Sequence, residues 1–299
     1  MSVTVAIPTA RRAAALGRLL DALPAALTGV PGVDVLVVDN DAAGSARDVV
    51  GDRARYVVEA TAGSAFARNR ALAETGAETI AFLDDDVVPQ PGWLAALLEP
   101  QAVATGGRVV LDPSVPRPRW FDEPGIGGYL TAFALDGPAR PLVDGEYVVT
   151  ASAAFDAAAL RAVGGFDPQL GPRPGAQLVA DDVHVVRELR RRGGTVWWQP
   201  DAVVVHDLPD ERLRPAWLLR RAYLQGRSDW MLDEELLRPR VGGGARVALS
   251  WLGTELGRRR REGLLRPATA FHLAADVSRT AGALGQGLRW RRDRDLGCS

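Results

Sequence analysis

Short apolar runs alternate with helical patterns along the first half of this 299-residue chain. The expected strands are Val3–Ile7, Val33–Val38, Thr79–Leu83 and Thr105–Leu111. The expected helices are Ala13–Leu27, where leucines recur three and four positions apart, Ser64–Thr75, and the segment that begins at Pro91. This alternation predicts an α/β fold with a mostly parallel, doubly wound sheet of the Rossmann-like kind.

The second part of the chain changes character twice. Asp112–Gly128 is rich in Pro and Gly and predicts a long loop, a kind of segment that often forms a binding site. From about Glu211 onward the pattern becomes helical. The elements expected in between are a strand at Gly145–Phe155, helices at Ala157–Val163 and Val183–Arg192, and strands at Val196–Gln199 and Ala202–Val205. The later helical candidates are Trp217–Tyr223, Arg246–Glu262 and Ala268–Leu288.

We therefore expect two domains. Residues 1–210 would form the α/β domain, in halves 1–111 and 112–210, and residues 211–299 a helical C-terminal extension. The first part holds 18 Arg against 27 acidic residues, and the extension 18 Arg against 10. Two hypotheses follow for the basic extension: peripheral contact with an anionic membrane, or packing on the first domain or on a second copy in a homodimer. The second is favoured, because a charge run is usually a solvated face.

Composition and charge exclude several classes of protein. The net charge of −1 gives no global field that would attract nucleic acid. Cys298 is the only cysteine, so the chain can form neither an internal disulfide nor a cysteine metal site. We see no signal peptide and no apolar stretch approaching the ~20 residues of a spanning helix, and we expect a cytoplasmic protein.

Three consecutive carboxylates, Asp84, Asp85 and Asp86, follow one of the predicted apolar strands. Like charges repel and ionised Asp is costly to bury, so core packing does not account for them. A bound divalent cation does, because it takes oxygen ligands and also holds substrate phosphates. The alternative is a solvated acidic turn. Thr9 and Asp39 also follow strands, and such strand ends meet at one edge of an open sheet.

Five motifs occur in a fixed order along about three quarters of the chain. They are Ile7-Pro8-Thr9, Val37-Val38-Asp39-Asn40, Ala67-Arg68-Asn69-Arg70-Ala71, Phe82-Leu83-Asp84-Asp85-Asp86, and Gly164-Gly165-Phe166-Asp167 followed by Asp181-Asp182. In this order they resemble the inverting nucleotide-sugar glycosyltransferases of family 2, which have the GT-A fold. The resemblance implies a metal-dependent enzyme that moves a sugar from a nucleoside-diphosphate sugar, expected to be UDP-linked, to an acceptor hydroxyl with inversion. The acceptor would be a glycan, a lipid-linked sugar or a small molecule.

The resemblance implies roles for the residues of the first four motifs. Thr9, Asp39 and Arg68 would line the pocket of the nucleotide base and ribose. Asp86 would ligate Mg²⁺ or Mn²⁺, and Asp84 and Asp85 would contribute to donor binding. The simpler alternatives are a turn carboxylate for Asp39, a backbone cap for Thr9 and a helix-surface side chain for Arg68.

The fifth motif would supply the base that an inverting transferase needs to take the acceptor proton. In the family a Glu-Asp pair opens a helix, and here the pair reads Asp181-Asp182. The resemblance assigns Asp182 as the base and leaves Asp181 beside it with a shorter reach than Glu. The alternative is a helix N-cap, a position that Asp also favours.

Two further positions bear on the site. His206 follows a predicted strand, at a place where related enzymes often carry a His near the metal or the diphosphate; a structural His is the alternative. Ser152 stands where this family often carries an Asn, and it would then face donor or acceptor sugar with a shorter reach.

Other functions remain open at this point. A nucleotidyltransferase can use a similar sheet and acidic site, but no glycine-rich basic loop follows the first strand. A catalytically degenerate relative could act as a nucleotide-sugar binding or assembly partner, although the carboxylates of both sites are intact. A dehydrogenase is excluded because the G-x-G-x-x-G turn is missing after the first strand.

Overall fold

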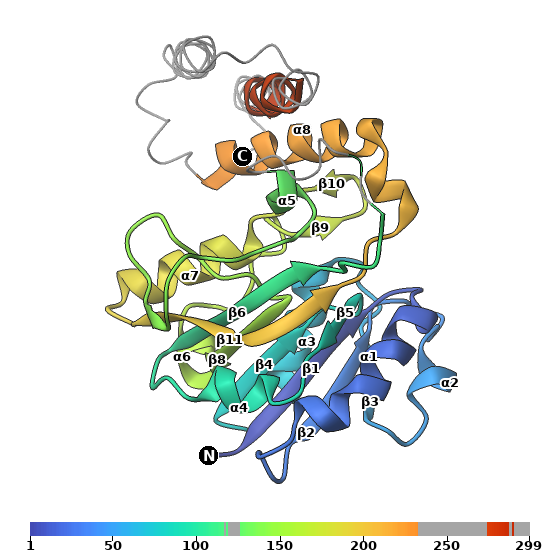
Figure 1. The fold of residues 1–299 in the computed structure, drawn as a ribbon, viewed down its shortest axis with the longest axis vertical. Helices are drawn as coiled ribbons and strands as arrows, with labels where there is room; N and C mark the ends of the chain where they lie inside the picture. The colour runs from blue at the N-terminus through green and yellow to red at the C-terminus, as the bar shows by residue number, and fades with distance from the viewer. Residues whose placement is uncertain (117, 119–125, 233–273, 287–288, 290–299) are drawn as a thin grey trace. The chain divides into compact units, whose positions relative to one another are not determined.

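A nine-stranded sheet forms the centre of the part of the chain described by this computed structural model, namely residues 1–116, 118, 126–232, 274–286 and 289 (Figure 1). Its strands are β1 (Val3–Thr9), β2 (Asp34–Asp39), β3 (Arg55–Val58), β4 (Thr79–Leu83), β5 (Val87–Pro89), β6 (Ala104–Leu111), β7 (Arg140–Pro141), β8 (Ser152–Asp156) and β11 (Val196–His206). The spatial order is β3-β2-β1-β4-β8-β6-β11-β5, and β7 pairs with β11. A separate hairpin joins β9 (Pro172–Arg173) to β10 (Ala176–Gln177).

The directions of the strands confirm the predicted α/β class and add detail to it. Strand β1 runs parallel to β2 and β4, β2 to β3, and β6 to β11. Strand β8 is antiparallel to its neighbours β4 and β6, as β5 and β7 are to β11. The sheet is therefore mixed, and the carboxyl ends of β1, β2, β4, β6 and β11 share one edge.

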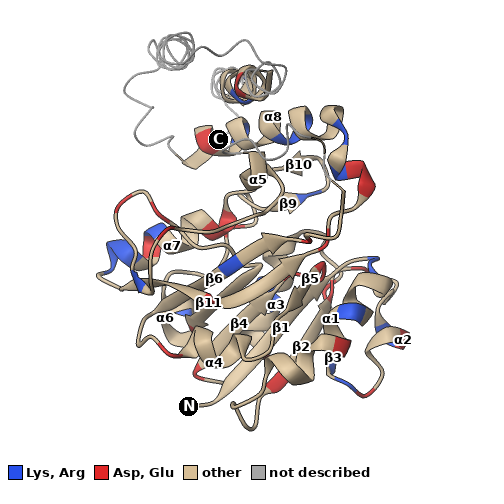
Figure 2. Cartoon of the chain, in the orientation of Figure 1, with Lys and Arg blue, Asp and Glu red and all other residues tan. Residues whose placement is uncertain are grey.

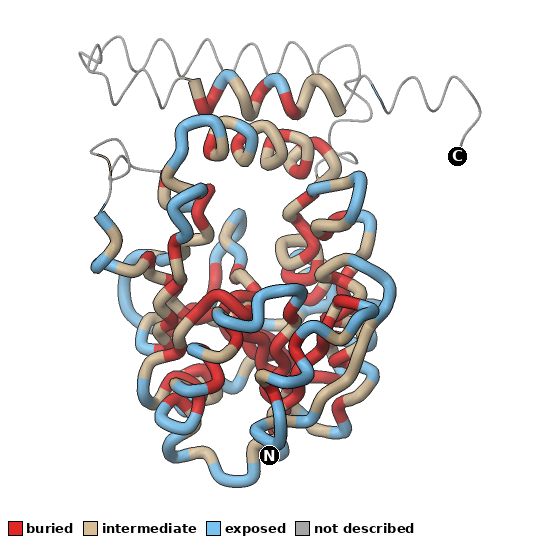
Figure 3. Tube along the Cα trace, turned by 90° about the vertical axis from the view of Figure 1, so that its right-hand side faces the viewer, coloured by how far each residue is buried: buried red, intermediate tan, exposed pale blue. Residues whose placement is uncertain are grey.

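Helices cover both faces of the sheet. The helices around it are α1 (Ala13–Ala26), α2 (Arg47–Val50), α3 (Ser64–Glu74), α4 (Trp93–Leu98), α6 (Ala157–Ala162) and α7 (Asp181–Arg191). One buried cluster joins α1, α2 and α4 to alternate strand residues such as Val5 and Ile7. The other joins α3, α6 and α7 to the intervening residues, such as Ala6 and Phe82. The two clusters form the two-sided core of a doubly wound fold. In Figure 3 the buried residues gather in the interior of the trace and the exposed residues lie at its outer turns.

Three expected elements differ in extent from the prediction. The strand expected at Gly145–Phe155 begins only at Ser152, because Gly145 adopts φ 87° and the chain turns before it joins the sheet. The two short strands expected after residue 195 are one strand, β11, whose register shifts between Gln199 and Val203. Pro200 lies inside this shift, where its missing N–H costs no ladder bond.

The chain divides into two compact units, and each is described by itself. The first comprises Met1–Pro113, Thr131–Gln177 and Asp181–Asp207, and it contains the whole sheet. The second comprises Ser114–Leu130, Leu178–Ala180 and Leu208–Ser299. Its described elements are α5 (Ile126–Tyr129), a 3₁₀ turn at Asp210–Leu213, α8 (Pro215–Leu232) and the helical residues 274–286. The expected domain boundary at residue 210 stays a prediction.

The helical candidates of the extension have different outcomes. Trp217–Tyr223 lies within α8, and Ala268–Leu288 is helical over the described residues 274–286. Arg246–Glu262 lies outside the described residues, as do residues 117 and 119–125 of the loop expected at Asp112–Gly128. None of the described helices is long and apolar enough to cross a membrane, and charged residues recur along α8 (Figure 2).

Within the second unit, α8 and the helix at 274–286 pack closely through two glycines. A Cβ added at Gly226 would lie 1.7 Å from the carbonyl oxygen of Arg279, and one at Gly282 would lie 1.8 Å from that of Tyr223. The Nε of Arg279 also donates to Asp229 at 2.6 Å across the same pair. Backbone therefore meets backbone at this crossing, and neither side can yield by a side-chain movement.

We expect Gly226→Ala to lower the free energy of unfolding by about 1–3 kcal/mol, the usual cost of overpacking, despite the higher helix propensity of Ala. Urea unfolding followed by circular dichroism measures the loss. Gly285→Ala is the matched control, because its nearest neighbour is the movable hydroxyl of Tyr223 at 3.1 Å. Equal stability of the two variants would contradict the close helix crossing.

Candidate functional site

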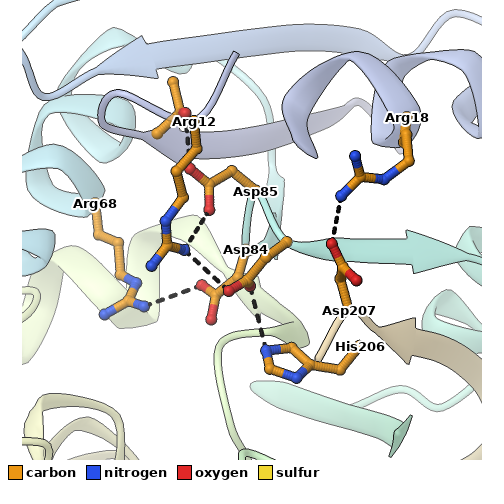
Figure 4. Close-up of polar contacts among 9 residues, drawn as sticks. Arg12, Arg18, Arg68, Asp84, Asp85, His206 and Asp207 are labelled. Carbon is orange, nitrogen blue, oxygen red and sulfur yellow. Dashed lines mark hydrogen bonds and ion pairs between the residues drawn. The ribbon is translucent and has the colours of Figure 1, made fainter. Parts of the chain in front are cut away.

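The residues singled out in the sequence gather at the carboxyl edge of the sheet, within the first unit (Figure 4). Asp84–Asp86 follow β4, Thr9 ends β1 and His206 ends β11. Arg68 comes from α3 and the acid pair from the first turn of α7. Helix α7 begins two residues earlier than predicted, at Asp181, so both carboxylates lie at the positive end of the helix dipole.

Arg68 joins the acid pair, Asp181-Asp182, to the acidic triplet, Asp84–Asp86. Its Nη1 donates to Oδ2 of Asp181 at 2.6 Å, and its Nη2 donates to Oδ1 of Asp84 at 3.2 Å. The guanidinium also lies 5.6 Å from the centre of the Phe166 ring. The side chain is buried, so the alternative of a helix-surface arginine is wrong. Arg68 instead fixes the distance between the two groups of carboxylates.

A second arginine, Arg12, bridges the other two carboxylates of the triplet. Its Nη1 donates to Oδ1 of Asp85 and to Oδ2 of Asp86, each at 2.9 Å. Thr9 also donates to Asp85, at 2.7 Å. Burial raises the pKa of Asp85, and the positive charge of Arg12 acts in the opposite direction. Both carboxylates are buried, whereas Arg12 is 47% exposed, so this cation can leave without disturbing the core.

His206 lies against the end of the triplet. Its Nε2 is 3.3 Å from Oδ1 of Asp86, and its side chain is buried. The next residue, Asp207, donates its backbone N–H to the carbonyl of Asp86 at 2.8 Å and forms an ion pair with Arg18 of α1. The imidazole therefore lies next to Asp86, the carboxylate to which the family motif assigns a metal.

Sequence reasoning missed Arg12 and Arg18. The signal for Arg12 was present, because the pair Arg11-Arg12 follows β1 at the edge where the triplet was expected. No comparable signal marks Arg18, which lies one and a half turns into a helix and reaches a residue 189 positions away.

Asp39 is wholly buried, and both of its oxygens are occupied. Oδ1 accepts from the backbone N–H of Asp41 at 3.1 Å, and Oδ2 accepts from the N–H of Ala46 at 2.7 Å. The Tyr56 hydroxyl donates to Oδ2 at 2.8 Å, and burial together with this bond raises the pKa of Tyr56 to about 12. Asp39 therefore organises the turn after β2, the simpler of the two roles, and its contact with a base stays a prediction.

The expectation for Ser152 is wrong. Its side chain is wholly buried in β8, and its Oγ accepts from the indole N–H of Trp93 at 2.9 Å. Ser152 thus contacts the core on the α4 face and cannot reach a sugar. Position 107 must be Gly for this packing, because a Cβ added there would lie 2.4 Å from the Ser152 Oγ.

Asp182 has the electrostatic character of a proton acceptor. Burial and then the charge of Asp181 raise its pKa to about 7, against the opposing effect of Arg68. Its Oδ1 accepts from the adjacent backbone N–H of Val183 at 2.8 Å. A carboxyl group with a pKa near neutrality can both accept and release a proton under physiological conditions.

The carboxyl groups at this edge outnumber the guanidinium groups, so the local charge favours the binding of a further cation. Six carboxyl groups face three guanidinium groups. The carboxyl groups are those of Asp84, Asp85, Asp86, Asp181, Asp182 and Asp207, and the guanidinium groups those of Arg12, Arg18 and Arg68. Among the described residues, no three His, Cys, Asp or Glu side chains form a ready metal site. Asp86 and His206 supply two adjacent ligand atoms, which suits a cation whose other ligands are substrate phosphates and water.

The chain is similar in sequence to several known proteins. Residues 4–123 match the family model for glycosyl transferase family 2. The chain is 30% identical over 272 residues to the pre-mycofactocin glycosyltransferase of Mycobacterium tuberculosis, covering 86% of this chain and 54% of that protein. It is 32% identical over 213 residues to the succinoglycan biosynthesis protein ExoM of Rhizobium meliloti, covering 67% and 65%. The chain therefore spans only about half the length of the mycobacterial relative.

A solved structure has the same fold. The mannosyltransferase PcManGT of Pyrobaculum calidifontis, solved in complex with GDP-Man and Mn²⁺, superposes with a TM-score of 0.61 at 20% identity. The match covers 95% of this chain and 86% of that one. The similarity confirms the GT-A fold class expected from the motifs.

Proposed function

The chain belongs to glycosyl transferase family 2, and from this premise we propose that it moves a sugar from a nucleoside-diphosphate sugar to an acceptor hydroxyl with inversion, assisted by a divalent cation. One observation carries the proposal. Arg68 links Asp84, at the expected donor site, to Asp181, next to the expected base. A donor bound at the triplet would thus be held in fixed relation to Asp182, as in-line displacement requires.

The residues have distinct parts in this reaction. Asp86 and His206 would hold a divalent cation together with the donor diphosphate, and the cation would stabilise the negative charge of the leaving group. Asp85 is held by Thr9 and Arg12 and keeps the loop after β4 in place. Asp182 would take the proton from the acceptor hydroxyl as that oxygen attacks the anomeric carbon from the side opposite the diphosphate.

The nucleotide is the least defined part of the donor. A UDP-linked sugar is our first candidate, and the GDP-Man complex of PcManGT makes a GDP-linked sugar the second. The acceptor is a hydroxyl of a glycan, a lipid-linked sugar or a small molecule.

A screen of UDP- and GDP-sugars with Mn²⁺ or Mg²⁺ tests the proposal, first by thermal shift and then by nucleotide release. Ligands that bind the native state raise its apparent stability. Proton NMR of the product then gives the anomeric configuration. Inverted product supports direct displacement, retained configuration contradicts it, and binding without turnover favours the degenerate binding partner.

Arg12 would compete with the cation for Asp85 and Asp86 in the absence of donor. We expect Arg12→Met to bind Mn²⁺ about two to five times more tightly, because an ion pair with an exposed partner is worth up to about 1 kcal/mol. Electron paramagnetic resonance of Mn²⁺ without nucleotide measures this affinity. The control is Arg18→Met. It removes an equal charge from the same edge, but the native Arg18 pairs with Asp207 and not with Asp85 or Asp86. Weaker Mn²⁺ binding by the Arg12 variant would contradict the competition.

A further inference from the structure

Arg108 lies on the face of the sheet that carries the proposed catalytic residues. Side chains alternate along β6, and a Cβ added at Gly106 would meet Val148, a member of the α3–α6–α7 core. A Cβ added at Gly107 would instead meet Ser152 Oγ, which bonds Trp93 in the opposite core. Two residues after Gly106, Arg108 therefore projects from the α7 face.

The register of the strands also gives the position of Arg108 along the strand direction. Gly106 pairs with Ala153 of β8, and Ala153 pairs with Phe82 of β4. Counting two residues along each parallel strand brings Arg108 level with Asp84. Asp84 is the first residue after β4, and at Phe82 and Gly106 the two strands are two strand spacings apart, roughly 9.5 Å. A sugar and a long side chain together can span such a gap.

Among the described residues, Arg108 has no ion-pair partner, and its Nε is buried without a hydrogen bond. This differs from the three guanidinium groups at the acidic edge, since Arg12, Arg18 and Arg68 all pair with carboxylates. An arginine stays charged in a protein, and a partly desolvated charge is costly unless an anion compensates it. The Nε atoms of Arg68, Arg70 and Arg173 are also buried without a hydrogen bond. Arg68 and Arg70 nevertheless pair with carboxylates through their terminal nitrogens, and Arg173 lies in the β9–β10 hairpin outside the main sheet.

We propose that Arg108 binds an anionic group of the substrate, a carboxylate or a phosphate, carried by the donor sugar or by the acceptor. The inference rests on the proposed function and adds a charge requirement to it. A guanidinium presents a planar fork that matches either oxyanion with two parallel hydrogen bonds. With the diphosphate at the acidic triplet, as proposed above, a side chain on β6 would contact another part of the donor or the acceptor.

Isothermal titration of the full chain with Mn²⁺ tests the donor arm through pairs that differ only in a carboxylate: UDP-glucuronate with UDP-glucose, and GDP-mannuronate with GDP-mannose. The acceptor arm compares glucose 1-phosphate with methyl glucoside in the presence of saturating UDP or GDP. A charged hydrogen-bonded contact predicts a preference of about 10–100-fold for the anionic member of one pair. Arg108→Gln should abolish that preference, and Arg108→Lys should retain part of it.

The control is Arg55→Gln, on the distant edge strand β3, which should leave the preference unchanged. A preference among the donors identifies the transferred sugar as the source of the anion, and a preference in the second arm identifies the acceptor. No preference in either arm, or one that survives in Arg108→Gln, overturns the inference. UDP and GDP alone report on the proposed function separately, because their binding does not depend on the sugar's charge.

Discussion

Asp182→Asn is expected to lower kcat by a factor of about 10²–10⁴, the usual contribution of a general base, while donor affinity stays near that of the unaltered enzyme. Asn has nearly the size of Asp and caps a helix as well, so α7 should keep its first turn. It cannot accept the acceptor proton. Single-turnover kinetics and equilibrium binding of the donor separate the two effects.

The pH dependence of the unaltered enzyme provides a second measurement of the same group. Burial and the charge of Asp181 raise the pKa of Asp182 to about 7, so the carboxyl is protonated and inactive as a base below that pH. We expect kcat/KM to rise with pH through a limb centred near 7 and then to level off. This limb should be missing in Asp182→Asn, because kcat/KM reports the groups of the free enzyme.

Asp156→Asn is the matched control for this variant. Asp156 caps α6 by accepting from the N–H of Ala159 at 2.7 Å, and it has no contact with the site residues. Its replacement keeps a cap and should leave kcat unchanged. If Asp182→Asn instead weakened donor binding with little change in kcat, Asp182 would be a binding or capping residue.

The sequence predicted the parts of the fold that depend on local pattern. The apolar runs that became β1, β2, β4 and β6 were each located to within one or two residues. The position of the carboxylates after β4 followed from the strand itself, since the end of an open parallel sheet is a ligand edge. The family motifs are short and contiguous, and through them the sequence assigned Arg68 and the acid pair to the same site as these carboxylates.

Other features depend on partners that are distant in sequence, so the local sequence pattern could not predict them. Strand β5 is a run of three residues, Val87–Pro89, that is a strand only because it pairs with β11. Ser152 looked like a site residue by position, but its strand directs it to Trp93. The position of Arg12 after β1 was a usable signal, but its partners were not predictable locally, because they are two carboxylates 73 and 74 positions away.

Removing the carboxylate at position 86 should have the other large effect. Asp86→Asn leaves Arg12 paired with Asp85, so we expect the fold to persist. It takes away one of the two adjacent ligand atoms proposed for the cation, leaving His206 alone. Charge stabilisation of the leaving group by a metal is worth several kcal/mol. A loss of about 4 kcal/mol corresponds to a decrease of roughly 10³-fold in kcat/KM.

Three measurements distinguish a metal role from a structural one. Mn²⁺-dependent binding of the donor should be lost in Asp86→Asn, whereas the thermal midpoint without ligand should change little. Asp207→Asn is the control, because it removes another carboxylate from the same edge. Asp207 pairs with Arg18, whereas Asp86 lies against His206. Chelation of divalent ions should reduce the unaltered enzyme to the level of Asp86→Asn. Full turnover in a chelator would show that the reaction needs no metal, and would leave the arginines of this edge as the source of positive charge.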